Sequence, residues 1–197
     1  MNIEPLAAGN YYHIFNRGVN GEDLFKEKKN YYYFLQQYQF YCADVLETYA
    51  YALLKNHFHM LVYVKETKTV PRKDGNGMYQ PEPSKQLSHF FNSYAQSINK
   101  AYNRTGPLFE SPFVRKLIDD DSYLTSVIYY CHYNPQLHGF VTNFKEWEFS
   151  SYHLILNHDP SFLASSKVTA CFGGKALFEQ AHINTYERKD ATKFCIE

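Results

Sequence analysis

The stretch NHFHMLV at residues 56–62 carries more information about this protein than any other part of its sequence. Its β-forming residues and their alternation predict a strand. Side chains at positions i and i+2 of a strand point to the same face, so we expect His57 and His59 to lie side by side. The apolar residues that alternate with them, among them Phe58 and Met60, then point to the opposite face, toward helices that cover the sheet.

The segments on either side of this strand predict an alternation of strands and helices. The expected elements are strands at 11–15, 46–54, 58–64 and 113–118, and helices at 30–44, from 84 over about twenty residues, and at 123–133. The Asn134–Pro135 step is expected to close the last helix. This order is typical of an α+β, ferredoxin-like (RRM-like) antiparallel sheet with helices packed on it, plus a C-terminal helix.

Two parts of the chain fall outside this core. Residues 65–83 contain three prolines and two glycines among charged residues, which indicates an elaborated loop that contributes no core residues. After about residue 156 the aromatic density falls, so we divide the chain into a main domain at 1–156 and a C-terminal extension of unknown role at 157–197. A short helix is expected near 175–183.

Composition restricts the environment of the protein. No apolar run approaches the roughly 18 residues that span a bilayer, and the first ten residues lack the apolar core of a secretory signal. The four cysteines are scattered without a CxxC pair, which favours free thiols in a reducing cytoplasm. We therefore expect a cytoplasmic protein.

The net charge of the chain limits the kinds of partner that it can bind. The chain of 197 residues has 20 Lys and Arg against 20 Asp and Glu, which argues against a protein that holds DNA by bulk electrostatics alone. Residues 84–118 nevertheless carry five basic residues and a single acidic one. Basic residues among aromatic ones are suited to phosphate contacts and base stacking. The alternative is a helix core with a solvated charged face, and we expect most of the aromatic residues to be core.

Two neighbouring imidazoles can share a metal ion if further ligands come from elsewhere, although paired histidines also occur at ordinary surface and core positions. Tyr130 and Asn134 are four residues apart, so they share a helical face if the last turn extends that far. If that face covers the strand of His57 and His59, one site holds two imidazoles, an amide oxygen and a phenol. Composition does not single out Tyr130, because the chain has 19 tyrosines.

Six segments between about residues 10 and 156 together carry a family resemblance. They are YHIFNRG at 12–18, HFHMLV at 57–62, YNR at 102–104 with GPLFESPF at 106–113, DDDSYL at 119–124, YCHYNP at 130–135 and WEFSSY at 147–152. In this order they resemble the REP-associated tyrosine transposases, relatives of the single-strand insertion-sequence transposases in the HUH (His-hydrophobic-His) nuclease superfamily. One departure is visible: Lys55 stands where that family usually has proline, which affects the hairpin rather than the ligands.

The resemblance implies a function and its residues. The tyrosine four positions before the Asn of the Asn–Pro step is the family's nucleophile, which maps to Tyr130. The histidine pair maps to His57 and His59, and Asn134 maps to a third metal ligand. A divalent ion, Mg²⁺ or Mn²⁺, is the implied cofactor, since an ion of this kind can screen a scissile phosphate. The implied reaction is cleavage and rejoining of single-stranded, hairpin-forming DNA through a 5′-phosphotyrosine intermediate.

We predict that a set of basic residues contacts the DNA, namely Arg17, Lys85, Arg104, Arg115 and Lys116. Two other classes of protein stay open at this point. One is a non-catalytic nucleic-acid-binding ferredoxin-like module, although such a module has no need of paired imidazoles. The other is a hydrolase that uses metal-bound water, in which Tyr130 merely packs. The sequence also leaves open a monomer or a homodimer.

Overall fold

The computed structural model describes residues 5–72 and 75–186, which form an antiparallel sheet between two helical layers. The sheet has the strand order β2-β3-β1-β6, and every neighbouring pair is antiparallel. The main elements in chain order are β1 (Tyr11–Arg17), α1 (Lys28–Cys42), β2 (Leu46–Leu53), β3 (His57–Val64), α2 (Pro83–Ala101), β6 (Val114–Ile118) and α3 (Asp121–Leu137). This confirms the predicted α+β class, with helices packed on an antiparallel sheet.

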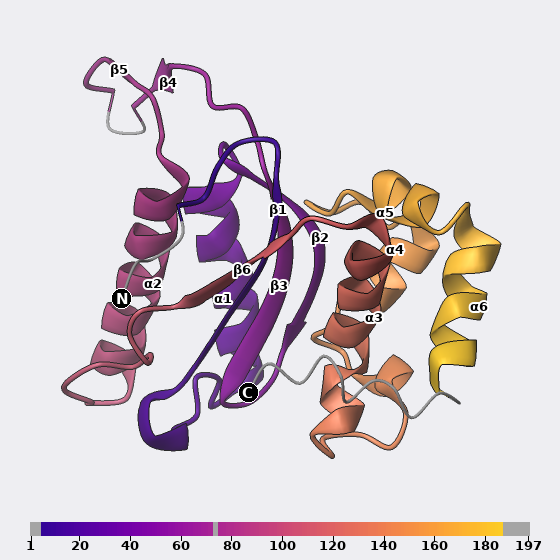
Figure 1. Ribbon diagram of the computed structural model, residues 1–197. Helices are drawn as coiled ribbons and strands as arrows, with labels where there is room; N and C mark the ends of the chain where they lie inside the picture. The colour runs from indigo at the N-terminus through magenta and orange to yellow at the C-terminus, as the bar shows by residue number, and fades with distance from the viewer. Residues whose placement is uncertain (1–4, 73–74, 187–197) are drawn as a thin grey trace.

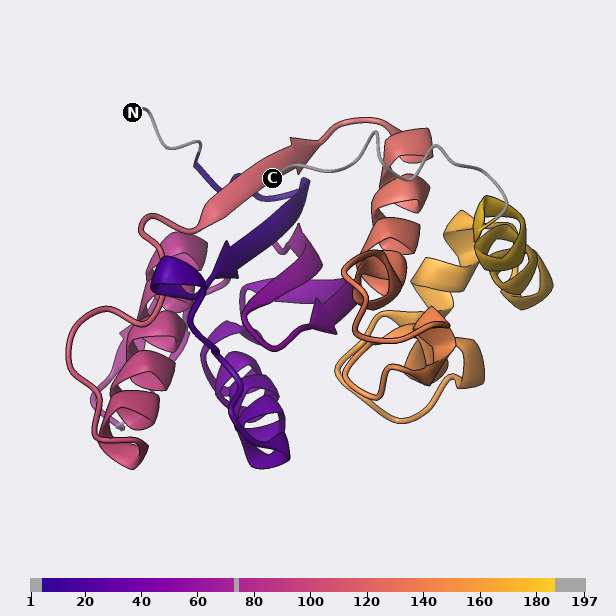
Figure 2. The same ribbon diagram turned by 90° about the horizontal axis from the view of Figure 1, so that it is seen from below.

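Helices cover the two faces of the sheet unequally. α1 and α2 lie side by side on one face, while α3 and the C-terminal helices lie on the other, as the two views in Figures 1 and 2 show. Each face has its own hydrophobic core. Tyr12, Ile14 and Phe58 belong to the core under α1 and α2, whereas Leu61 and Val127 belong to the core under α3. β2 and β3 are buried on both faces because their alternate side chains contact one core or the other, whereas most of β6 is exposed or half-buried.

Strand register decides which polar side chains meet. Phe15 is the partner of His59, and Arg17 is the partner of His57, in the β1–β3 ladder. These four side chains therefore share the face of the sheet that α3 covers only in part. The turn after Arg17 requires Gly18, since a Cβ there would overlap the carbonyl oxygen of Glu22.

The third helix is longer than the sequence analysis predicts. The Asn134–Pro135 step does not end it, and α3 continues to Leu137 with Pro135 inside. Proline has no N–H for the carbonyl one turn earlier and its ring crowds that turn, so it is disfavoured at this position, yet two further residues of α3 follow it. The end is instead closed by the His138 N–H, which donates to the carbonyl of Asn134 at 3.0 Å. Asn134 is thereby fixed in helical geometry, one turn after Tyr130.

The connection between β3 and α2 is the elaborated loop that the sequence predicts, with a small hairpin added. Residues 65–83 contain a small hairpin of β4 (Val70–Pro71) and β5 (Met78–Tyr79), which stands apart from the main sheet (Figure 1). A tight hairpin joins β2 and β3 and is closed by the Leu54 N–H, which donates to the carbonyl of His57 at 2.8 Å. No helix in the described ranges is long and apolar enough to cross a membrane.

The C-terminal part packs on α3. It comprises α4 (Tyr152–Asn157), α5 (Ser165–Cys171) and α6 (Lys175–Tyr186), and α6 confirms the helix expected near 175–183. Val168 and Phe178 are fully buried in the same core as α3. The division of the chain at residue 156 stays a prediction, and residues 187–197 of the extension lie outside the described residues.

Candidate active site

The face of α3 that meets the sheet carries Tyr130 and Asn134. The ring of Tyr130 lies 5.3 Å from the ring of His59, centroid to centroid, and nearly perpendicular to it. Asn134 Oδ1 lies 3.1 Å from Nε2 of His57. The spacing in the sequence predicts that these four residues meet if α3 covers the histidine strand, and the structure brings all four together.

The spacing of the two elements explains this match. Four residues of α-helix advance about 6 Å, and two residues of strand advance about 6.7 Å. Tyr130 and Asn134 on α3 therefore stand opposite His59 and His57 on β3, with the helix and the strand running in opposite directions. The N-terminus of α3 is fixed by Asp120, whose carboxylate accepts a hydrogen bond from the Tyr123 N–H at 2.9 Å.

A third histidine, His13 on β1, belongs to this cluster. Its Nε2 lies 3.0 Å from Nδ1 of His59, and its ring centroid lies 5.9 Å from that of Tyr130. Burial lowers the pKa of His13 to about 3, with a further contribution from the positive charge of Lys116. Burial also lowers the pKa of His59 well below its usual value, with added effects of the neighbouring histidines. Both rings are therefore neutral at physiological pH.

His13 is a site residue that the sequence does not predict. Its place in the β-forming stretch 11–15 predicts that it points to the same face as Tyr11 and Phe15. Its contact with His59 depends on the register between β1 and β3, which no local pattern contains. His138 is a second such residue. It follows α3, and its ring lies 4.7 Å from that of His57 because of how the helix packs on the sheet, which no local pattern contains.

The polar atoms of the site fit a cation. Both ring nitrogens of His57 face amide oxygens: Nδ1 lies 2.8 Å from Asn56 Oδ1, and Nε2 lies 3.1 Å from Asn134 Oδ1. A neutral imidazole carries one hydrogen and can satisfy one of these oxygens. If Nδ1–H donates to Asn56, His57 Nε2 and Asn134 Oδ1 are two electron-pair donors 3.1 Å apart, a spacing that suits two ligands of one cation.

His59 points to the same conclusion. Its Nε2 is buried and has no hydrogen-bond partner among the described residues. Buried polar atoms are almost always paired, so a buried imidazole nitrogen without a protein partner, beside other electron-pair donors, suits a metal ligand. The residues that could hold a metal ion are His57, His59 and Asn134. In the described ranges no three His, Cys, Asp or Glu residues form such a group, because the third donor here is an amide.

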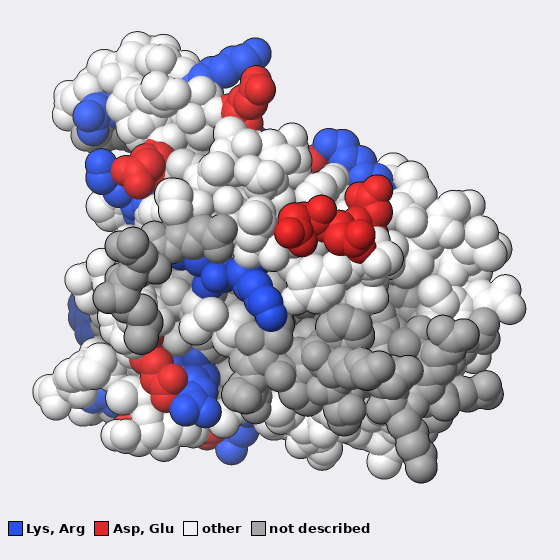
Figure 3. Space-filling model, in the orientation of Figure 1, with Lys and Arg blue, Asp and Glu red and all other residues white. Residues whose placement is uncertain are grey.

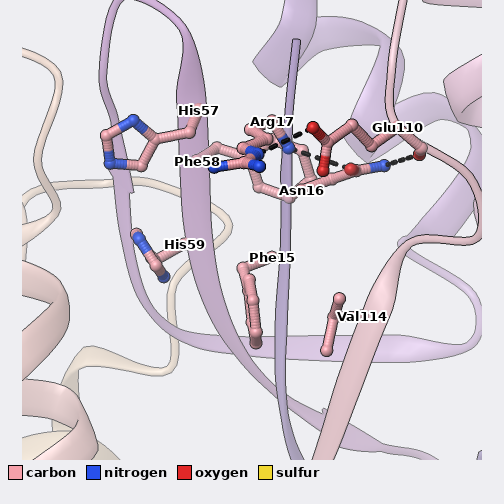
Figure 4. Close-up of a pocket in the computed structure, with 8 residues that line it drawn as sticks. All are labelled: Phe15, Asn16, Arg17, His57, Phe58, His59, Glu110 and Val114. Atoms are coloured by element: carbon pink, nitrogen blue, oxygen red, sulfur yellow. Dashed lines mark hydrogen bonds and ion pairs between the residues drawn. The ribbon is translucent and has the colours of Figure 1, made fainter. Parts of the chain in front are cut away.

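A pocket of about 210 Å³ opens beside the two histidines. Figure 4 shows His57 and His59 projecting from β3 toward the same side, with Phe15 and Val114 across the neighbouring strands. Arg17 Nε donates to Glu110 Oε1 at 2.8 Å at the pocket's other end, and the Asn16 amide donates to the Glu110 carbonyl at 2.9 Å. The pocket is thus open to a ligand that reaches the histidines from the uncovered part of the sheet.

Two of the five residues predicted to bind DNA share this face. Arg17 lines the pocket, and 62% of its side chain is exposed. Lys116 is the β6 partner of His13, and its ammonium group lies 5.9 Å from the centroid of the Tyr123 ring. These two cations are therefore placed close to the candidate active site.

The other three lie elsewhere. Arg115 points to the opposite face, where Nη1 donates to Ser84 Oγ at 3.0 Å and the guanidinium stacks on Phe113. Lys85 is exposed near the start of α2 and pairs with Glu82. Arg104 is only 13% exposed and is held by Glu22 and by Asn99. The structure does not gather the five residues into one patch, and their contact with DNA stays a prediction.

Positive and negative side chains are mixed on the surface, as expected for a chain with a net charge of zero. On the described part of the face shown in Figure 3, blue and red side chains are interspersed with uncharged surface. Among the ion pairs of the described residues is that of Lys55 Nζ with Asp23 Oδ2, 3.0 Å apart. Lys55 stands where the resembled family usually has proline. Its ammonium group is paired with the carboxylate of Asp23, which lies in the loop before α1. The carbonyl of Lys55 also accepts from the Phe25 N–H at 3.0 Å, which ties this hairpin to the loop before α1.

The fold and the site together define an α+β domain in which a helical tyrosine faces a His-hydrophobic-His pair on a central strand. A comparison with models of known protein families finds no match. A Haemophilus influenzae protein named provisionally as a REP-associated tyrosine transposase is 30% identical over 112 residues. That match covers 54% of this chain and 59% of the relative, so the chain spans less than two thirds of the relative's length.

A solved structure has a similar fold. It is that of a REP-associated tyrosine transposase bound to a REP hairpin, with a TM-score of 0.63 and 14% identity. The similarity covers 80% of this chain and 85% of that chain. The sequence similarity to the Haemophilus influenzae protein confirms the resemblance to REP-associated tyrosine transposases that the sequence motifs indicate, and the solved structure shows that the fold is shared.

Proposed function

We propose that this protein is a transposase-type endonuclease that cleaves and rejoins single-stranded DNA at hairpin-forming repeats, with Tyr130 as its nucleophile. The observation that carries the proposal is the meeting of Tyr130 and Asn134 on α3 with His59 and His57 on β3. The similar fold of a transposase bound to a REP hairpin supports a DNA hairpin as the substrate.

The reaction that suits this geometry is a transesterification. The phenol oxygen of Tyr130 forms a bond to phosphorus as the bond from phosphorus to the 3′ oxygen breaks. The phenol loses its proton, and the departing 3′ oxygen gains one, which leaves a 5′-phosphotyrosine link and a free 3′-hydroxyl. Attack of a 3′-hydroxyl on the link reverses these changes. The ester bond is conserved at each step, so rejoining needs no ATP.

The chain's own residues position the reacting groups. α3 holds Tyr130 2% exposed against the rings of His59 and His13, so the phenol has a fixed orientation. Arg17 and Lys116 supply positive charge on the same face for the phosphates that flank the scissile bond. The open pocket beside His57 and His59 leaves room for the strand to approach.

We infer that His57 Nε2, His59 Nε2 and Asn134 Oδ1 hold a divalent ion, Mg²⁺ or Mn²⁺. All three ligands are neutral, so an ion held here would keep most of its charge to screen the scissile phosphate and stabilise the leaving oxygen. The 3.1 Å approach of His57 Nε2 to Asn134 Oδ1 supports this ligand set, as does the buried Nε2 of His59, which has no partner among the described residues. Mn²⁺ is the easier match to two imidazoles, and Mg²⁺ to an oxygen-rich reacting site.

The test is formation of a covalent protein–DNA adduct. The protein is incubated with a hairpin oligonucleotide that has single-stranded flanks, with Mn²⁺ or Mg²⁺, and the products are separated under denaturing conditions. We expect a denaturant-resistant adduct that disappears in Tyr130→Phe and on addition of a chelator. Binding of the hairpin itself should persist in Tyr130→Phe, because that change removes only the phenol oxygen.

Tyr129→Phe is the matched control. Tyr129 is the adjacent residue on α3, but its ring faces the C-terminal helices, 5.4 Å from Tyr133 and 5.6 Å from His182. An adduct that persists in Tyr130→Phe and vanishes in Tyr129→Phe would refute the assignment of the nucleophile. Hairpin binding without any adduct would favour a binding module, and release of cleaved DNA without an adduct would favour a hydrolase.

A further inference from the structure

The contact between His13 and His59 has a chemical consequence for the proposed metal site. We propose that His13 is a positioning residue that holds His59 in the tautomer whose Nε2 is free to bind the ion. This inference rests on the proposed function, because it concerns one ligand of the ion proposed there. It adds a residue outside the His-x-His stretch to the machinery of the site.

The two rings form one buried unit. Nε2 of His13 lies 3.0 Å from Nδ1 of His59, and the rings are near parallel with centroids 5.1 Å apart. Their exposed fractions are 0% and 2%. Since both rings are neutral, exactly one of the two facing nitrogens carries the hydrogen of this bond.

Two arrangements of hydrogens satisfy the contact. In the first, His13 Nε2–H donates to His59 Nδ1, and the hydrogen of His59 then sits on Nε2, which cannot bind a metal. In the second, His59 Nδ1–H donates to His13 Nε2, so His59 Nε2 has a free lone pair. The hydrogen of His13 then sits on Nδ1.

Hydrogen bonding within the protein does not choose between them. His59 Nε2 and His13 Nδ1 both lack a partner among the described residues. Each arrangement therefore leaves one buried N–H unpaired, on His59 in the first and on His13 in the second. A cation at His59 Nε2 selects the second, because it binds only to the lone pair.

The surroundings of His13 keep its ring in place for this role. The ring lies 5.0 Å from that of Phe15 on one side and meets the edge of Tyr130 at 5.9 Å. Strand register fixes its backbone between Leu61 on β3 and Lys116 on β6. A histidine ligand whose second nitrogen donates to a fixed acceptor is held in one tautomer and one orientation, and loss of such a partner commonly weakens metal binding 10- to 100-fold.

The first test compares Mn²⁺ affinity in two substitutions, measured from the loss of the free-ion electron paramagnetic resonance signal. His13→Leu removes the acceptor, and we expect about 10- to 100-fold weaker binding. His13→Gln places an amide oxygen near the position of Nε2, and we expect it to recover most of the affinity. Circular dichroism checks that each variant is folded.

The second test uses the wild-type protein, so it does not depend on the folding of a variant. Long-range ¹H–¹⁵N spectra with saturating Mg²⁺ should show the hydrogen of His13 on Nδ1 and that of His59 on Nδ1. A hydrogen on Nε2 of His13 would overturn the inference. So would a folded His13→Leu variant that binds Mn²⁺ as tightly as the wild type, or a His13→Gln variant as weak as His13→Leu.

The two proposals fail in different ways. If the wild type binds Mn²⁺ and forms the adduct while His13→Leu is unaffected, the role of His13 is wrong and the proposed function stands. If the wild type binds no Mn²⁺, the proposed metal site is wrong, and the role of His13 falls with it. If the wild type binds no Mn²⁺ but still forms the adduct in chelator, only the metal site is wrong. If it forms no adduct under any condition, the tyrosine mechanism is wrong as well.

Discussion

Asn134 Oδ1 lies 3.1 Å from His57 Nε2, although 77 positions separate the two residues in the sequence. This distance suits a hydrogen bond, and it also suits two ligands of one ion. Two donors about 2.1 Å from a common ion and at right angles to each other lie about 3 Å apart. The packing of α3 on β3 thus gives the two atoms a spacing that suits neighbouring ligands of the proposed ion.

Removal of the amide oxygen should therefore impair the metal site directly. In Asn134→Ala we expect Mn²⁺ affinity and adduct yield to fall by roughly 100-fold or more, since loss of a ligand should cost at least as much as loss of a second-sphere partner. Asn134→Asp keeps an oxygen at this position and should keep metal binding. The same Mn²⁺ titration and adduct assay measure both. Unchanged affinity in folded Asn134→Ala would remove Asn134 from the ligand set.

The salt dependence of hairpin binding should report on the predicted DNA-binding residues. Arg17→Ala and Lys116→Ala should each weaken binding and lower the slope of log affinity against log salt by about 1, because each removes one phosphate contact. Among the five residues, these two should matter most, since they lie on the face of the histidine pair. Fluorescence anisotropy over a range of salt concentrations gives the slopes.

The natural comparison is Lys85→Ala, at an exposed residue that pairs with Glu82 near the start of α2. An effect of Lys85 equal to that of Arg17 would show that DNA extends over the α2 side of the molecule. Equal slopes in the wild type, Arg17→Ala and Lys116→Ala would contradict the phosphate contacts assigned to these two residues.

The buried histidines should make the fold sensitive to acid. Burial lowers the pKa of His13 to about 3 and that of His182 to about 4, against about 6.5 for an unfolded histidine. Between pH 6.5 and about 4 the unfolded chain therefore binds more protons than the folded chain, so stability falls as the pH is lowered through this range. Each group contributes about 1.4 kcal/mol per pH unit.

Urea unfolding at pH 7.5 and pH 5.5, in buffer with chelator, measures this dependence. The midpoint should fall clearly at the lower pH. His89→Gln is a suitable control, because His89 is exposed on α2 and its loss should leave the difference between the two pH values unchanged. A midpoint that is the same at both pH values would show that the buried rings do not titrate as their burial requires.

A chain of hydrogen bonds should tie α6 to α3. His182 Nδ1–H donates to the carbonyl of Phe178 at 2.7 Å, so its Nε2 is left to accept from His132 Nδ1–H at 2.8 Å. In His182→Leu the His132 donor is buried without this partner, which should lower the free energy of unfolding by about 1–3 kcal/mol. Chemical denaturation at pH 7.5 measures the loss.

Ile183→Ala provides the matched substitution on the same helix. Its side chain is 48% exposed, so truncation should have little effect on stability. Equal stability of His182→Leu and the wild type would show that the His132–His182 contact does not hold the C-terminal helices on α3.

Local sequence patterns predicted the order of the elements well, because each pattern reports which face of an element is apolar. Leu87, Phe90 and Tyr94 recur at helical spacing, and α2 buries all three. The end of α3 was predicted too early. A rule about proline and its preceding residue is local, whereas the final turn of α3 is held by backbone hydrogen bonds that form despite Pro135.

The sequence by itself determined which residues could carry the chemistry: the alternation at 57–59 places two imidazoles on one face, and the spacing of Tyr130 and Asn134 places both on one side of a helix. Only the tertiary structure decided that these two faces meet, and that His13 joins them from β1. Strand register and the docking of a helix on a sheet are set by side-chain packing between segments far apart in the chain. Residues such as His13 and His59 touch because of that packing, and no local pattern records it.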